Sequence, residues 1–317
     1  MKILVTGGNG YVGRELCRQL YDSHRVLVVD ELRYGANRFC EDDLARLDLI
    51  QADVSDVRAM AAVREFAPDV VIHLAAIHYI PECETNPALA VSTNVAGTVA
   101  MLQACPPGCR FVFASSGAVY APDASPHSET EAATVPTDIY GLSKLQGEHY
   151  VRYIARARGF PAVIVRLFNV VGPGETNPHL LPEIIAQLKA GNRSIRLGNL
   201  WPKRDYIHVR DAARGFAAAA LEGAVANGDA VAVNLGTSKA YSVSEVVERL
   251  RRISGCQFEL LEDSSRVRAV DRPVLAADVG RIRRMFGWSA RLSIDDALSD
   301  LWREPDLSEA LLAKYRS

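Results

Sequence analysis

The fold is decided by Val5-Thr6-Gly7-Gly8-Asn9-Gly10-Tyr11-Val12-Gly13, a GxxGxxG loop near the start of the chain. The loop follows a short β-branched run, residues 2–6, and opens a helical segment that extends to about residue 21. Glycines in such a loop permit a tight turn and a close backbone approach, while the helix N-terminus offers free N–H groups to a pyrophosphate. A simple strand-to-helix turn without a ligand also fits this loop alone, so further features have to decide.

Short apolar runs alternate with helix-length segments through the first half of the chain. This rhythm predicts an α/β fold with a parallel, doubly wound sheet of the Rossmann type. Runs without polar alternation, such as Val70-Val71-Ile72, are typical of strands that helices cover on both faces. The expected strands after the first are residues 26–29, 70–74, 110–114 and 162–167.

The pattern changes after residue 168, where Gly172-Pro173-Gly174 precedes shorter, mixed elements. A chain of 317 residues exceeds what one hydrophobic core usually holds, which fits two closely joined parts. We expect residues 1–168 to form the dinucleotide-binding domain, to which the chain returns at about residues 207–236. We expect residues 169–206 and 237–317 to form a smaller, mixed α/β substrate lobe.

Asp30, at the end of the second expected strand, supports a cofactor site at the glycine loop. An acid at this place accepts hydrogen bonds from the hydroxyls of a ribose. Asp30 and Glu31 would also repel a 2′-phosphate, so we predict NAD rather than NADP. Arg33 and Arg38, nearby in the sequence, favour the opposite choice.

Composition narrows the classes of partner and location. The net charge of -2 gives no global positive field, so we expect no nucleic-acid partner. The six cysteines form no CxxC pair and no Cys/His cluster at zinc spacing, so we expect no metal site. The chain shows no signal-like leader and no run of about 18 apolar residues. We therefore expect a cytoplasmic protein without a membrane partner.

Tyr140 and Lys144 are the predicted centre of the chemistry. Their i, i+4 spacing puts both side chains on one face of a helix that Thr137 or Asp138 could cap. A free tyrosine has a pKa of about 10, but a lysine ammonium, an oxidised nicotinamide and a helix N-terminus each favour the phenolate. Tyr140 could then remove a hydroxyl proton from a sugar while a nicotinamide accepts hydride from the same carbon. Ser116, at a strand end, could share this hydrogen bond. Taken alone, Tyr-xxx-Lys is more often an ordinary exposed helical pair.

Together these residues resemble the extended branch of the short-chain dehydrogenase/reductase family, whose members modify nucleotide-sugars. The resemblance covers residues 1 to about 288. Besides the glycine loop, Asp30 and the Tyr140/Lys144 pair, it rests on Asp53-Val54, His73-Leu74-Ala75-Ala76, Asn94, Ser115-Ser116, Arg166-Leu167-Phe168-Asn169, Arg204-Asp205-Tyr206-Ile207-His208-Val209, and Arg268 with Asp271.

The resemblance implies a Rossmann domain that holds NAD, with Asp53 and Val54 at the adenine and Lys144 also at the nicotinamide ribose. Arg204 and Arg268 would grip the diphosphate of the substrate, because bidentate guanidinium groups suit phosphate oxygens. The expected cofactor residues are Gly7, Gly10, Tyr11, Val12, Gly13, Asp30, Asp53, Val54, Leu74, Ala75, Ala76, Asn94, Tyr140 and Lys144. The expected substrate residues are His78, Ser116, Asn169, His179, Leu180, Arg204, Arg268 and Asp271, and the expected catalytic residues are Ser116, Tyr140 and Lys144.

The residues after the active-site serine separate the reactions within this family. Here Gly117 and Ala118 offer no acidic side chain. The 4,6-dehydratases and the sugar decarboxylases that this family includes carry an acidic residue at this place. The reduced set of Ser116, Tyr140, Lys144 and NAD is what 4-epimerisation of a UDP-sugar requires. The alternatives are a 4,6-dehydratase, a one-way keto-sugar reductase and, from another class, a non-catalytic NAD-binding regulatory protein.

The identity of the sugar stays open. His78 stands where the similar 4-epimerases carry a lysine, and Leu275 where a tyrosine or a smaller residue adjusts the space around the sugar. A histidine there could favour the carboxylate of UDP-glucuronate over UDP-glucose or UDP-galactose, or it could serve structure alone. His179 precedes Leu-Leu-Pro, much as the partner histidine does in the epimerase/reductases of deoxyfucose-type sugars.

Residues 86–104 bear on the oligomeric state, because this segment is apolar almost all round. A helix of this kind is buried on more than one side. We expect a homodimer, and burial inside one subunit is the alternative.

Overall fold

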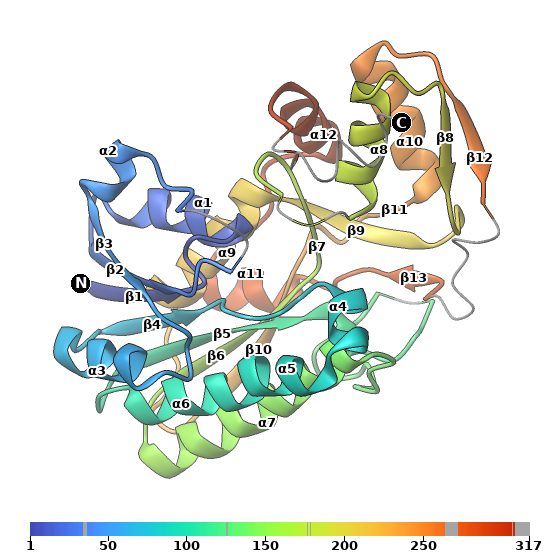
Figure 1. Cartoon of the computed structure of the whole chain (residues 1–317). Coiled ribbons are helices and arrows are strands. Elements are labelled where there is room, and N and C mark those ends of the chain that lie inside the picture. The colour runs from blue at the N-terminus through green and yellow to red at the C-terminus, as the bar shows by residue number, and fades with distance from the viewer. Residues whose placement is uncertain are drawn as a thin grey trace.

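A seven-stranded parallel sheet forms the centre of the structure (Figure 1). The computed structural model describes residues 1–33, 37–124, 126–175, 177, 179–263, 272–305 and 307. The strand order β10-β6-β5-β4-β1-β2-β3 is that of a doubly wound sheet, which confirms the predicted fold class. The strands are β1 (Lys2–Thr6), β2 (Arg25–Asp30), β3 (Leu47–Gln51), β4 (Val70–His73), β5 (Arg110–Ser116), β6 (Ala162–Leu167) and β10 (Ala230–Leu235).

Helices cover both faces of this sheet. Because side chains alternate along a strand, Ile3 and Val5 pack against the helices of one face and Leu4 packs against those of the other. Burial on both sides explains why the strand sequences are almost continuously apolar. One face holds α1 (Tyr11–Leu20), α9 (Val209–Leu221) and α11 (Gly280–Phe286), and the other holds α3 (Val57–Phe66), α6 (Gly97–Ala104) and α7 (Ile139–Arg158).

The apolar segment 86–104 is an interrupted helix. It consists of α5 (Pro87–Val91), a π-helical turn η1 (Ser92–Ala96) and α6. α6 contacts α3 on one side and α7 on the other. These neighbours cover its apolar faces within one subunit, so this segment by itself gives no argument for a dimer.

A second, smaller part surrounds its own core. α8 (Leu180–Lys189), α10 (Val243–Ser254) and α12 (Ile294–Arg303) pack around buried side chains such as Ile184, Val246 and Leu298. α11 lies within the range expected for this lobe, yet it packs on α9 and β10 of the large sheet. The remaining strands are β7 (Asn169–Val171), β9 (Lys203–His208), β11 (Ala240–Ser242) and β13 (Val274–Leu275) in one sheet, and β8 (Ser194–Leu197) with β12 (Glu259–Glu262) in another.

Among the described residues, none of the helices combines the length and the apolar character needed to cross a membrane.

A buried ion pair joins α7 to the centre of the sheet. Arg166 on β6 donates two hydrogen bonds to the Glu148 carboxylate on α7, from Nε at 2.8 Å and from Nη2 at 2.7 Å. The Ser115 hydroxyl on β5 donates to the same carboxylate at 2.6 Å. Arg166 also donates to the hydroxyl of Tyr120, which donates in turn to Asn234 on β10. One network therefore fixes α7 against three adjacent strands.

Replacing Arg166 by methionine should lower the free energy of unfolding by about 3–5 kcal/mol, because the buried Glu148 loses both guanidinium hydrogen bonds and keeps Arg152, at 3.6 Å, as its remaining cation. The double variant Glu148→Met/Arg166→Met should recover much of this loss, since neither charge remains. Arg25→Met breaks an exposed pair with Asp48 and should cost no more than about 1 kcal/mol. Denaturant unfolding measures all three, and an equal loss in the single and double variants would contradict the role given to the ion pair.

Candidate active site

A cavity of about 690 Å³ runs along the carboxyl ends of the central strands and reaches into the second part. In doubly wound sheets ligands bind at this edge, where the strand order reverses. The cavity is lined by expected cofactor residues from the first four strands and by expected substrate residues from the second part. Those that line it are Gly7, Gly10, Tyr11, Val12, Gly13, Asp30, Asp53, Val54, Leu74, Ala75, Ala76, His78, Ser116, Tyr140, Lys144, Asn169, His179, Leu180 and Arg204.

The glycine loop has the close packing that a dinucleotide site needs. Gly7 has a φ of 69°, and a Cβ placed there would lie 2.7 Å from the amide nitrogen of Ala75. A Cβ on Gly13 would clash with the carbonyl oxygen of Gly7. The loop thus keeps the α1 N-terminus close to the end of β1 and leaves its N–H groups facing the cavity, a cradle that fits a pyrophosphate.

Asp30 is held in place for a ribose. Its two carboxylate oxygens accept backbone N–H bonds from Asn9 at 3.0 Å and from Leu32 at 2.8 Å. Each oxygen keeps a further lone pair for a hydroxyl. Burial raises the pKa of Asp30. Arg33, which could have attracted the 2′-phosphate of NADP, forms ion pairs with Glu31 at 3.8 Å and with Glu82 at 2.5 Å. Two acidic side chains therefore already bind this cation.

Ser116, Tyr140 and Lys144 come together at the end of β5 and the start of α7. The Asp138 carboxylate caps α7 by accepting the N–H of Gly141 at 2.7 Å, which places Tyr140 in the first helical turn. The Ser116 side chain lies close enough to Tyr140 to lower the pKa of its phenol. The Nζ atom of Lys144 lies 5.8 Å from the centroid of the Tyr140 ring. The predicted catalytic residues are therefore neighbours in space.

Burial sets the protonation of this pair. It raises the pKa of Tyr140, while the hydrogen bond from Ser116 acts in the opposite direction. Burial also lowers the pKa of Lys144 to about 7. Tyr140 is thus a neutral phenol in the free protein, whereas Lys144 keeps part of its positive charge near neutral pH, and a positive charge next to the phenol favours the phenolate.

Arg272 is a site residue that the sequence reasoning missed. Its guanidinium donates to the carbonyl oxygens of Tyr120 at 2.6 Å and Ala118 at 2.8 Å, and to the Thr137 hydroxyl at 3.1 Å. It thereby ties the turn after Ser116 to the residues that precede α7. The sequence analysis selected Arg268 and Asp271, which are close to Arg272 in the chain. Both of them lie outside the described residues.

Asn94 lies behind the cavity and does not line it. Its amide donates to the carbonyl oxygen of Ile77 and to the Ser143 hydroxyl, both at 2.9 Å, and its oxygen accepts the N–H of Ile77 at 2.8 Å. Ser143 also donates to the carbonyl oxygen of Tyr140. This geometry makes Asn94 a positioning residue for the turn of α7 that carries the tyrosine.

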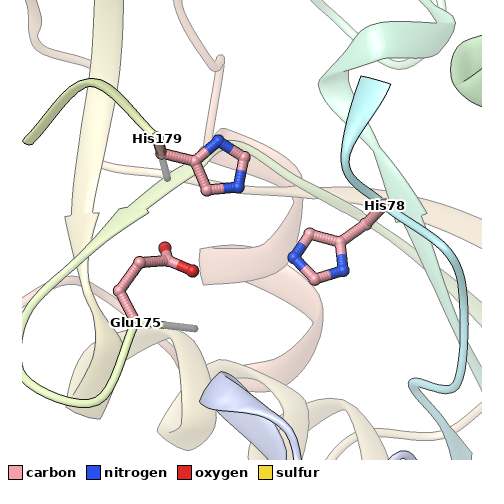
Figure 2. A group of neighbouring side chains, drawn as sticks. All are labelled: His78, Glu175 and His179. Atoms are coloured by element: carbon pink, nitrogen blue, oxygen red, sulfur yellow. The ribbon is translucent and has the colours of Figure 1, made fainter. Parts of the chain in front are cut away.

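His78 and His179 meet a third side chain, Glu175, at the substrate end of the cavity (Figure 2). One potential ligand atom of each residue lies within 4.8 Å of those of the other two. Burial and the nearby His179 lower the pKa of His78. Sequence reasoning selected both histidines but missed Glu175, which is four positions from His179 but 97 positions from His78 and forms no known motif with either.

Comparisons with known proteins identify the family of this chain. Residues 3–236 match the family model described as the NAD dependent epimerase/dehydratase family. The chain is 32% identical over 320 residues to a UDP-glucose 4-epimerase of Streptomyces lividans, covering 95% of each chain. Two solved structures are similar to it over 96% of its length, each with a TM-score of 0.85.

The first of these structures is a UDP-glucuronic acid 4-epimerase from Bacillus cereus in complex with UDP-glucuronic acid and NAD, with 25% sequence identity and 98% of that chain covered. The second is a UDP-glucose-4-epimerase from Stenotrophomonas maltophila with bound NAD and formylated UDP-arabinopyranose, with 29% identity and 97% covered. Since the family model spans most of the chain, this protein belongs to the NAD-dependent epimerase/dehydratase family.

Proposed function

We propose that this protein is an NAD-dependent UDP-sugar 4-epimerase that works by transient oxidation at C4 of the sugar. The observation that carries the proposal is the meeting of Ser116, Tyr140 and Lys144 in one cavity with the glycine loop and Asp30. The similar proteins whose names and titles specify 4-epimerisation of UDP-glucose or UDP-glucuronic acid support it.

In this mechanism Tyr140 is base and acid in turn. Its phenolate removes the proton of the C4 hydroxyl, and Ser116 donates a hydrogen bond to the same oxygen. Lys144 stabilises the phenolate by its charge. NAD held along the glycine loop supplies the hydride acceptor and later the donor. The 4-keto sugar then rotates in the site, so that its other face meets the hydride donor. Tyr140 returns its proton to the C4 oxygen, and the product is the 4-epimer.

The turn that follows Ser116 favours epimerisation over dehydration. Gly117 and Ala118 form a short 3-10 turn, η2 (Gly117–Val119), and offer no carboxyl group beside the sugar. Elimination of water needs a second acid/base group in addition to the tyrosine. We therefore assign the smaller set of groups to reversible hydride transfer at a single carbon.

The substrate end of the cavity fits a nucleotide-sugar. Asn169 begins β7, Leu180 begins α8 and Arg204 lies on β9, and all three line the cavity. Arg204 donates to the carbonyl oxygen of Arg272 at 2.9 Å, which fixes the guanidinium near the catalytic turn. We assign Arg204, together with Arg268, to the diphosphate of the substrate.

We further propose that the protein forms a homodimer through α7. Leu142, Tyr150 and Tyr153 follow one another along one side of this helix and are 44%, 45% and 75% exposed. Val91 on the adjacent α5 is 45% exposed. We expect a second copy of this chain to cover this helix face. In a two-fold symmetric dimer the same face of α7 from each subunit packs against its copy.

Wild-type protein should interconvert at least one UDP-sugar with its 4-epimer without net use of cofactor. NMR of separate incubations with UDP-glucose, UDP-galactose, UDP-N-acetylglucosamine and UDP-glucuronate reports the reaction and the substrate together. Tyr140→Phe should keep the bound NAD but lose about 10²- to 10⁴-fold in activity, the usual contribution of a general base. Tyr153→Phe, on the exposed stripe, is the matched control and should remain active.

The outcomes of this experiment separate the alternatives. Stoichiometric consumption of added reduced cofactor would favour a reductase, and loss of the 6-hydroxyl would favour a dehydratase. No conversion of any substrate by a protein that binds NAD would favour a regulatory role.

Replacing Lys144 by methionine should move the rise of kcat with pH to higher values by about 1–3 pH units. The reason is that loss of the nearby ammonium raises the pKa of Tyr140, so the phenolate forms only at higher pH. Lys239→Met, at an exposed position, should leave the profile unchanged. A lower kcat with an unshifted pH midpoint would show that Lys144 acts only in binding.

Tyr153→Asp should convert the dimer to monomers, because it places a charge on the most exposed apolar residue of the proposed interface. Sedimentation velocity at micromolar concentration distinguishes the two masses. Val57→Asp alters another exposed apolar residue, at the start of α3, and should remain dimeric. A monomeric wild-type protein at this concentration would overturn the proposal of a dimer.

A further inference from the structure

The cluster of His78, Glu175 and His179 has no role in the reaction proposed above. Its members come from two segments: His78 follows β4, and Glu175 and His179 lie in the loop between β7 and α8. Figure 2 shows the Glu175 carboxylate and a ring nitrogen of each histidine turned toward the same space. Convergence of three donors from two segments far apart in the sequence is more specific than a pair on one helix.

The ring of His78 is already oriented as a ligand. Asn177 donates its amide N–H to Nε2 of His78 at 2.9 Å. An amide nitrogen can only donate, so Nε2 carries the lone pair and the neutral ring carries its proton on Nδ1. A hydrogen bond to the ring fixes the tautomer and the ring orientation, as it does in histidines that bind metals.

The carboxylate of Glu175 decides the charge of the ligand that fits. A sugar carboxylate or a phosphate placed between the three side chains would be repelled by it, whereas a cation would be attracted. Two histidines and one glutamate also form the protein ligand set of one class of catalytic zinc sites, in which a further position remains open. The cluster therefore suits a divalent transition metal better than an anionic group of the substrate.

We propose that His78, Glu175 and His179 form a binding site for a divalent transition-metal ion, with zinc as the fitting example. All three residues line the cavity, so the remaining coordination position faces the space that a substrate oxygen or a water molecule would occupy. This assignment replaces the expectation of no metal site, which considered cysteine pairs and local Cys/His spacing alone.

The observed separations are close to those of a coordination sphere. Ligand atoms about 2.0–2.2 Å from a tetrahedral zinc ion lie about 3.5 Å from one another. The three atoms here lie within 4.8 Å, so an inward rotation of the side chains completes the site. Asn177 would then withdraw its N–H from Nε2 of His78 or turn its amide oxygen toward the ion.

Metal binding can be measured without substrate, so the result does not depend on the proposed epimerase activity. Untagged full-length protein, freed of metal by a chelator, is titrated with Co²⁺ as the spectroscopic probe. We expect one equivalent to bind with visible absorption bands and to be displaced by Zn²⁺. Metal content after dialysis against Zn²⁺ gives an independent count.

Variants identify the ligands in the same titration. His78→Ala, Glu175→Gln and His179→Ala should each weaken Co²⁺ binding at least tenfold and change the spectrum. His149→Ala, on the exposed side of α7, is the matched control and should bind as wild type does. Circular dichroism of the metal-free variants checks folding, and His179→Ala is the safest of them because its side chain makes no capping bond to α8.

Two results would overturn the proposal. One is the absence of Co²⁺ or Zn²⁺ binding to wild-type protein at micromolar concentration, which would leave the three side chains as a hydrogen-bonded cluster. The other is binding that the three variants leave unchanged.

Discussion

The buried ion pair between Glu148 and Arg166 is the constraint on which the geometry of the active site depends. α7 carries Tyr140 and Lys144 in its first two turns and Glu148 one turn later, while β5 carries Ser116 next to Ser115. Because Arg166 and Ser115 both bind the Glu148 carboxylate, the helix cannot slide or rotate against the strand without breaking a buried charged network. The position of Ser116 relative to Tyr140 is thus set in part by Glu148 and Arg166, which do not line the cavity.

Burial has a second effect at the same place, because it disfavours the charge of every group that the chemistry uses. It raises the pKa of Tyr140 and lowers the pKa of Lys144 to about 7. In such a site a single added positive charge shifts the proton more than it would in water, since screening by solvent is weak. In the proposed mechanism, the positive charge of bound NAD would add to that of Lys144 in favouring the phenolate.

The fold and much of the site could be predicted because their signals are local. The glycine loop, Asp30 and the Tyr140/Lys144 spacing each lie within one strand-helix unit, where the sequence determines which side chains share an edge or a face. Arg272 and Glu175 could not be predicted in this way. Arg272 reaches backbone carbonyl groups, which have no sequence signature, and Glu175 meets His78 only because the fold brings the loop before α8 to the segment after β4. The apolar segment 86–104 shows the converse, since its apolar composition indicated burial but could not tell α3 and α7 from a second subunit.

The first helix, α1, connects the glycine loop to the loop on the opposite side of the cavity. Tyr11, at the start of α1, donates to the carbonyl oxygen of Gly172 at 2.9 Å, and Arg14 donates to that of Gly174 at 3.0 Å. The helix that opens at the glycine loop therefore also holds the loop that leads to Glu175. Through these two bonds the cofactor end of the cavity and the wall that carries Glu175 form one connected unit. Any coupling between ligands bound at the two places is then reciprocal, since each ligand changes the affinity for the other by the same factor.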